Sequence, residues 1–139
     1  MRYLCMLTCA AAIATCVDVA PRTAGAADRA LIGDEAADSV LLRDVVARDD
    51  GGVTGVVVNR STRLVRDVRL LIRHGWLWKN ERHPGDDSPG RVAYHLVPAD
   101  VPPGGNIEFR YHPDPPLPDR SDGRFETTVE VVGSTEVGW

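Results

Sequence analysis

Cysteine and methionine are nearly missing from this 139-residue chain, and the few that occur lie close to its start. The cysteines are Cys5, Cys9 and Cys16, and the methionines are Met1 and Met6. From residue 27 onward the chain therefore has neither a thiol nor a thioether. This excludes from that part a disulfide framework, a cysteine nucleophile, thiol redox chemistry, a blue-copper site and a methionine-rich copper(I) site.

Basic charge is also in short supply. Lys79 is the only lysine, and 16 Lys and Arg residues stand against 20 Asp and Glu, for a net charge of −4. Proteins that bind nucleic acid usually carry a basic excess, so this balance argues against a nucleic-acid partner. A composition rich in Ala, Arg, Val, Asp, Gly and Pro but poor in Lys is typical of GC-rich bacterial genomes.

The first 26 residues have the pattern of a secretory signal peptide. A basic start at Met1-Arg2 precedes an uncharged apolar run from Tyr3 to Val17, and the small residues Ala24-Gly25-Ala26 follow. This predicts cleavage after Ala26 and export to the periplasm or the extracellular space. The apolar run is shorter than the roughly 20 residues of a transmembrane helix, so we expect no membrane span after cleavage.

Two alternatives for the amino terminus stay open. Ile13-Ala14-Thr15-Cys16 resembles the lipobox of bacterial lipoproteins, although Thr15 stands where that motif has Gly, Ala or Ser. A lipid anchor on Cys16 is therefore less favoured than simple cleavage. An uncleaved anchor is also less favoured, because Asp18 and Pro21 end the apolar run early.

The remainder predicts a flexible segment over residues 27–38, which are small and acidic, and then one β domain over residues 39–139. The domain is long enough to bury a core of its own. Short apolar runs, or apolar residues at alternate positions, indicate strands when turn-forming residues bound them. The predicted strands cover 39–47, 53–59, 91–97, 106–112 and 125–132.

The segment Val65–Trp78 fits two periodicities. As a strand, it places Val68, Leu70, Ile72 and His74 on one face. As a helix, it has an apolar stripe flanked by arginines. Its β-branched residues and its position between strands favour the strand. With this strand the chain has six or seven strands and no convincing helix, which predicts an all-β, immunoglobulin-like sandwich.

A set of short motifs resembles the bacterial FxLYD-type domains. The resemblance rests on a glycine-containing strand, an Asn-x-Ser turn, an Asp-Val step and a Pro-Gly turn that precedes a phenylalanine. It implies an immunoglobulin-like sandwich on an exported or envelope protein, without a general enzymatic activity. In this chain the motifs are Gly55–Asn59, Ser61, Asp67-Val68, Pro103-Gly104 and Phe109.

No catalytic residue, cofactor or metal ligand is predicted. The serines lack a G-x-S-x-G elbow, and the acidic turns lack the spacing of a calcium loop. The four histidines lack the H-x-H or H-E-x-x-H spacing of metal sites, so surface or strand-edge positions are favoured. They are His74, His83, His95 and His112.

The tryptophan pair Trp76 and Trp78 is the best candidate contact site. On a strand both indoles face the same side, next to a polar loop over Lys79–Gly90. Exposed aromatic side chains of this kind mark contacts with a partner or a sugar. We therefore expect partner-binding residues at Trp76, Trp78, Lys79 and Arg82. The expected function is a non-enzymatic, exported binding or structural module of the bacterial envelope that contacts another protein. The alternative is a periplasmic carrier of a small ligand or metal that uses the histidines.

Overall fold

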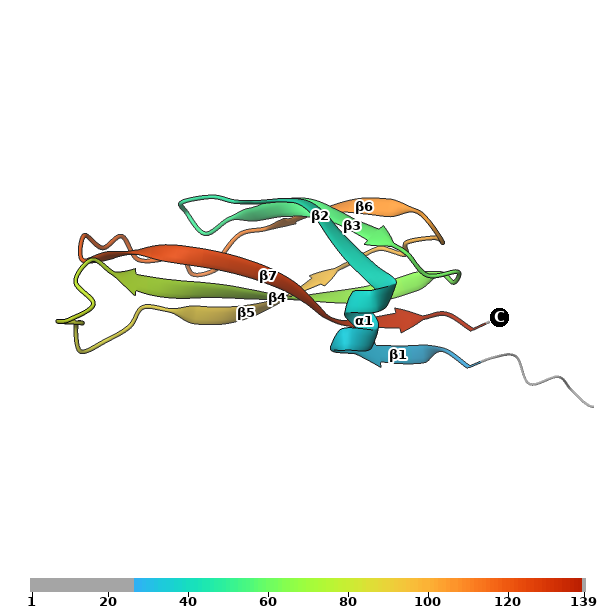
Figure 1. Cartoon of the computed structure of the whole chain (residues 1–139). Helices are drawn as coiled ribbons and strands as arrows, with labels where there is room; N and C mark the ends of the chain where they lie inside the picture. Colours follow the sequence, from blue (N-terminus) through green and yellow to red (C-terminus); the bar gives the residue numbers. More distant parts are fainter. Residues whose placement is uncertain (1–26, 139) are drawn as a thin grey trace, which may run out of the picture.

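The seven strands form two antiparallel sheets that pack face to face, in a computed structural model that describes residues 27–138 (Figure 1). The predicted all-β sandwich of about seven strands is confirmed. One short helix, α1, covers Asp34–Ser39. The strands are β1 Arg29–Ile32, β2 Val40–Ala47, β3 Val53–Asn59, β4 Val65–Trp78, β5 Arg91–Val97, β6 Asn106–Tyr111 and β7 Gly123–Glu136.

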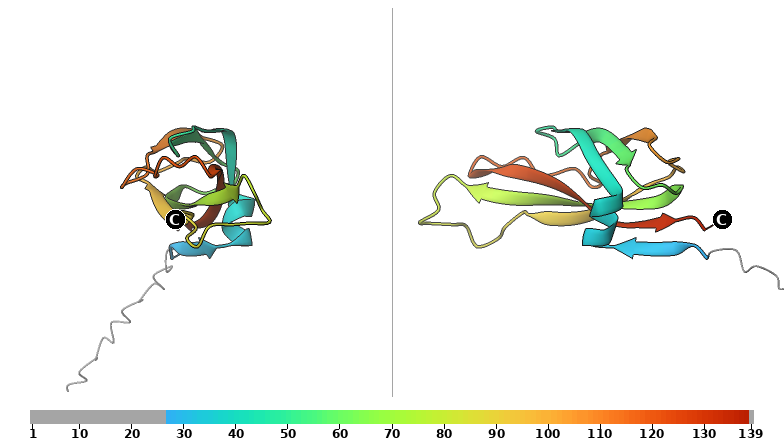
Figure 2. Two further views of the ribbon diagram at one scale, coloured as in Figure 1. Left: turned by 90° about the vertical axis from the view of Figure 1, so that its left-hand side faces the viewer. Right: turned by 45° about the vertical axis from the view of Figure 1, so that its right-hand side comes forward.

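The two sheets differ in length. The first has the order β1-β7-β4-β5 and the second β2-β3-β6. Strands β4 and β7 contain 14 residues each and pair along their whole length, from Val65 opposite Glu136 to Trp78 opposite Gly123. The shorter second sheet covers only part of this ribbon, so one end of β4 and β7 extends past it (Figures 1 and 2).

The core lies between the sheets and follows the predicted alternation. On β4, Val68, Leu70, Ile72 and His74 are each at most 1% exposed, and β3 contributes Val53 and Val57. Because β4 pairs with β5 on one side and with β7 on the other, its backbone groups are satisfied as a central strand. The strand prediction for Val65–Trp78 is thus confirmed over the helical alternative.

Buried Asn59 fixes the turn between β3 and β4. Its Nδ2 donates hydrogen bonds to the carbonyl oxygens of Arg63 (2.7 Å) and Val101 (2.8 Å). Its Oδ1 accepts one from the backbone N–H of Ser61 (2.9 Å). The Asn59 side chain therefore stabilises its own turn and also connects this turn to the segment before β6. The Asn-x-Ser sequence predicts the hydrogen bonds within the turn, and only the structure shows the bond to Val101.

Two aspartates sit where the strand register shifts. Asp44 in β2 and Asp67 in β4 both have a φ of 53°, and a bulge or irregularity lies at each. Aspartate tolerates this left-handed conformation better than most residues, because its short side chain can satisfy nearby backbone groups. The bulges bend two otherwise regular strands.

The prediction of a flexible segment over residues 27–38 is corrected. β1 pairs with the end of β7, with Arg29 opposite Glu136, and α1 follows it. Leu31 is 3% exposed and Ala36 is fully buried, so both belong to the core. A four-residue strand is too short to show an alternating pattern in the sequence. β1 is held in place by its pairing with β7, which lies about 100 residues further along the chain.

The first long strand begins at Val40 rather than at residue 39. The predicted signal peptide, its cleavage after Ala26 and the alternative lipid anchor on Cys16 lie outside the described residues. Among residues 27–138, no helix has the length and apolar character needed to cross a membrane.

Candidate functional site

Three aromatic rings and an arginine gather where the β4–β7 ribbon extends past the second sheet. We call Trp76, Trp78, Phe125 and Arg120 the aromatic end cluster. Trp76 lies opposite Phe125 in the β4–β7 register, and their ring centroids are 4.7 Å apart in an edge-to-face arrangement. The rings of Trp76 and Trp78 are 6.1 Å apart at 88°. These are the geometries that aromatic quadrupoles favour.

Arg120 spans both indoles and joins two loops. Its guanidinium carbon lies 5.5 Å from the ring centroid of Trp76 and 5.4 Å from that of Trp78, within cation–π range. It forms ion pairs with Asp122 and with Asp87, which belongs to the Lys79–Gly90 loop. The hydrogen bond from Arg120 is the main cause that lowers the pKa of Asp122. The two loops are thereby held over the aromatic rings.

A cleft of about 560 Å³ opens beside the cluster. Its apolar wall comes from Trp76, Phe125 and Leu117, and its polar wall includes carboxylates and guanidinium groups. Sites for small ligands combine apolar surface with a few polar groups in this way. The polar side chains are Asp49, Asp50, Asp119, Arg120 and Arg124.

The structure brings most of the predicted contact residues to this end of the ribbon. Trp76 and Trp78 are both half-buried, and Nε1 of Trp76 is buried with no hydrogen-bond partner among the described residues. The backbone N–H of Lys79 donates to the carbonyl of Asp122 at 2.9 Å. Arg82 lies further out, in the exposed loop.

Arg120 and Phe125 were not predicted as site residues. The position of Phe125 follows from the strand register, which pairs it with Trp76. The strand that contains Phe125 was predicted from the sequence, but the register that places Phe125 opposite Trp76 was not. Arg120 carries no comparable signal, because it is one arginine in a proline-rich loop and only the tertiary structure places it over the indoles.

The histidines do not form a site together. Among residues 27–138, no group of three or more His, Cys, Asp and Glu side chains is arranged to hold a metal ion. His74 is 1% exposed, lies 2.9 Å from Thr127 Oγ1 through Nδ1, and stacks on Tyr111 at 6.0 Å. His95 packs edge-on against the same Tyr111 at 5.7 Å. Both are core histidines, while His83 and His112 are exposed.

Burial lowers the pKa of both core histidines below the ordinary 6.5, and Arg91 adds to the effect at His74. The neutral imidazole is thus the form that the folded protein favours. Nε2 of His74 has no hydrogen-bond partner within residues 27–138. A proton on Nδ1, donated to Thr127 Oγ1, leaves only an acceptor unsatisfied and is the less costly tautomer.

The free energy of unfolding is therefore expected to fall as the pH is lowered from about 7.5 to about 5.5. Between the lowered folded-state pKa and 6.5, the unfolded chain binds more protons, so acid favours unfolding. This contribution is complete above pH 6.5 and is lost below it. Urea unfolding across this range measures the slope. His74→Gln should reduce the slope, and His83→Gln in the exposed loop should not; equal slopes in all three proteins would contradict the prediction.

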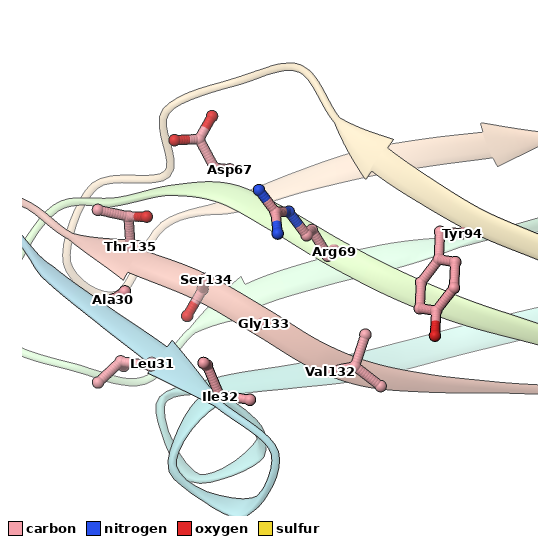
Figure 3. Close-up of a pocket in the computed structure, with 10 residues that line it drawn as sticks. All are labelled: Ala30, Leu31, Ile32, Asp67, Arg69, Tyr94, Val132, Gly133, Ser134 and Thr135. Atoms are coloured by element: carbon pink, nitrogen blue, oxygen red, sulfur yellow. The ribbon is translucent and has the colours of Figure 1, made fainter.

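A second hollow lies on the outer face of the four-stranded sheet. This groove, of about 670 Å³, runs across β1, β7, β4 and β5 near the Asp67 bulge (Figure 3). Ile32 and Tyr94 stand on its two sides and are 76% and 74% exposed, and Gly133 lies between them. Arg69 is its cationic group. The groove is apolar, open and separate from the aromatic end cluster.

Comparison with known proteins gives one distant similarity. No protein-family model matches the chain, so the resemblance to FxLYD-type domains stays a prediction, and no solved structure gives a significant match. Over 106 residues the chain is 29% identical to the alpha-1,4-glucan:maltose-1-phosphate maltosyltransferase of Rhodospirillum rubrum. That match covers 72% of this chain but 15% of the enzyme. This chain is thus similar to a small part of a much longer enzyme.

Proposed function

We propose that this chain is a non-catalytic binding module whose ligand occupies the cleft beside the aromatic end cluster. The observation that carries the proposal is the position of Arg120, which Asp122 and Asp87 hold over two indole rings. Arg120 and Trp76 line the cleft, and Trp78 contributes by packing on both of them. Aromatic rings held in place by charged neighbours form a contact surface that loses little conformational freedom on binding. A binding role also agrees with the sequence, in which we recognise no catalytic motif.

The ligand class that fits best is an α-1,4-linked glucan. A pyranose ring has a face of C–H groups, which packs on an aromatic ring, and a rim of hydroxyls. Asp49, Asp50 and Asp119 can accept hydrogen bonds from those hydroxyls, and Arg120 can donate to their oxygens. The similarity to an enzyme named for an α-1,4-glucan supports the same class.

Trp78→Ala is expected to weaken the binding of maltoheptaose at least about tenfold, which corresponds to about 1.4 kcal/mol. Isothermal titration calorimetry measures the affinity, with the β-1,4-linked cellohexaose as the linkage control. The matched control variant is Leu77→Ala, which lies between the two indoles on the opposite face of the same strand. It should leave the affinity within twofold.

Trp76 is expected to act differently, because it packs on Phe125 and forms the inner part of the cluster. Trp76→Ala should lower the melting temperature more than Trp78→Ala does. The glucan proposal fails if the unaltered protein does not bind maltoheptaose, or if Trp78→Ala binds it as tightly as Leu77→Ala. Unfolding of the domain by Trp78→Ala would instead assign Trp78 to the core.

Contact with another exported protein through the same end is the second candidate. It is favoured by the exposed polar loop beside Trp78, which includes Lys79 and Arg82. Protein contacts usually combine a few aromatic anchors with such a polar rim. Capture of one envelope protein by the unaltered chain but not by Trp78→Ala, together with no binding of maltoheptaose, would favour this candidate over the glucan.

A further inference from the structure

Strand β5 is an edge strand with an apolar outer row. Within residues 27–138 it pairs with β4 and with no other strand. Val92, Tyr94 and Leu96 point away from the core and are 53%, 74% and 49% exposed. Tyr94, at the middle of the row, also lines the groove of Figure 3. A row of this kind on an open edge is the surface to which a further strand adds.

The other three sheet edges carry features that discourage strand addition. β1 has only four residues. β2 is interrupted by the bulge at Asp44. β6 turns the polar side chains Asn106, Glu108 and Arg110 outward. Short strands, bulges and outward charges are the usual means by which proteins protect their sheet edges. β5 has seven residues, no register shift in its pairing with β4, and no charge in its outer row.

We propose that β5 pairs with β5 of a second copy of this chain, antiparallel about a two-fold axis at Tyr94. Tyr94 then faces the partner's Tyr94, and Val92 faces the partner's Leu96. Several registers would place the outer faces of both copies on the same side of the joined sheet. Of these, this register pairs all three apolar residues with apolar residues of the partner. The two four-stranded sheets join into one sheet of eight strands.

The charges on the inner side of β5 agree with this register. Arg91 comes opposite the partner's Val97, and Ala93 comes opposite the partner's His95. No two like charges meet across the axis, and like charges directly opposite each other would destabilise a strand pair. The pairing is therefore self-complementary on both faces. It uses a surface apart from the aromatic end cluster, so it does not depend on the proposed function.

Sedimentation velocity of the purified protein tests the oligomeric state. A reducing agent is present, so that disulfides through Cys5, Cys9 or Cys16 cannot form. The unaltered protein should be a dimer at micromolar concentrations. Tyr94→Lys, which sets two cations against each other at the axis, should dissociate at least about tenfold more readily. Thr128→Lys is the matched control, because Thr128 is exposed on β7 of the same sheet, which β4 separates from β5. It should remain dimeric, and both variants should keep the circular dichroism spectrum of the folded protein.

A second variant tests the register. Tyr94→Cys should form a covalent dimer on mild oxidation, because directly opposed residues have Cα atoms about 4.5–5.5 Å apart and a disulfide spans that distance. In all three proteins Cys5, Cys9 and Cys16 are first changed to Ser, so that no other thiol can form the link. In this background, Thr128→Cys and the protein with Tyr94 intact should form little covalent dimer. A monomer at all concentrations overturns the proposal. So does a dimer that Tyr94→Lys leaves intact, or a dimer that Tyr94→Cys does not link.

Discussion

Leu70→Ala is expected to lower the free energy of unfolding by about 2–5 kcal/mol. Leu70 is fully buried at the centre of β4, where it lies opposite His95 on one side and Val131 on the other. Truncation removes three carbon atoms from the core, and the two rigid sheets cannot move together to fill the space that is left. The loss of stability therefore includes both the transfer free energy of the removed atoms and the cost of the new cavity. Urea unfolding followed by circular dichroism measures the change.

Leu41→Ala is the matched control for this substitution. Leu41 lies on the edge strand β2 and is 42% exposed, so its side chain loses little burial. The expected cost is below about 1 kcal/mol, since less apolar area returns to water and no closed cavity forms. Similar losses for the two variants would mean that Leu70 is not at the centre of the core.

Gly123→Ala is expected to lower the free energy of unfolding by about 1–3 kcal/mol and to loosen the aromatic end cluster. A β-carbon at Gly123 would overlap the carbonyl oxygen of Leu77 and lie 2.6 Å from the indole of Trp76. Neither neighbour is the free end of a flexible side chain, so the ribbon itself must shift. Urea unfolding gives the free energy, and tryptophan fluorescence reports the loosening.

Gly133→Ala is the control on the same strand. The nearest atom to a β-carbon there is the carbonyl oxygen of Leu31, at 3.6 Å, which is ordinary contact. Gly133→Ala should change the free energy of unfolding by less than about 1 kcal/mol, and the tryptophan fluorescence should not change. If the two glycine variants behave alike, close packing against Trp76 is not what requires glycine at position 123.

The parts of the fold with a clear period were predictable from the sequence. β3 and β5 match their predicted bounds, because β3 is a short apolar run and β5 alternates, each between turn sequences. In β5 the alternating pattern does not show which face is buried, since the apolar row of Val92, Tyr94 and Leu96 faces outward. Period alone gives two faces, and only the position of the second sheet decides which face is buried.

Features that depend on distant partners were not predictable. β1 is too short to show a pattern, and the end of β7 supplies its order. Trp76 and Trp78 were expected to share a face and to serve as anchors. Their partial burial comes from Arg120 and from the loop that contains Gly85, which returns against the ring of Trp78. One arginine and one glycine in irregular loops carry no local signal of such contacts.

The pairing of β1 with the end of β7 sets the direction in which the domain presents its proposed ligand site. The described chain enters and leaves at the same pole, near Arg29 and Glu136, and the aromatic rings lie at the other end of the ribbon. At about 3.3 Å per residue, the 14 residues of β4 separate the two poles by about 45 Å. A lipid, a membrane or a neighbouring domain attached at either terminus would therefore sit behind the module. The cleft would point outward, within reach of a long polymer that could not approach the point of attachment.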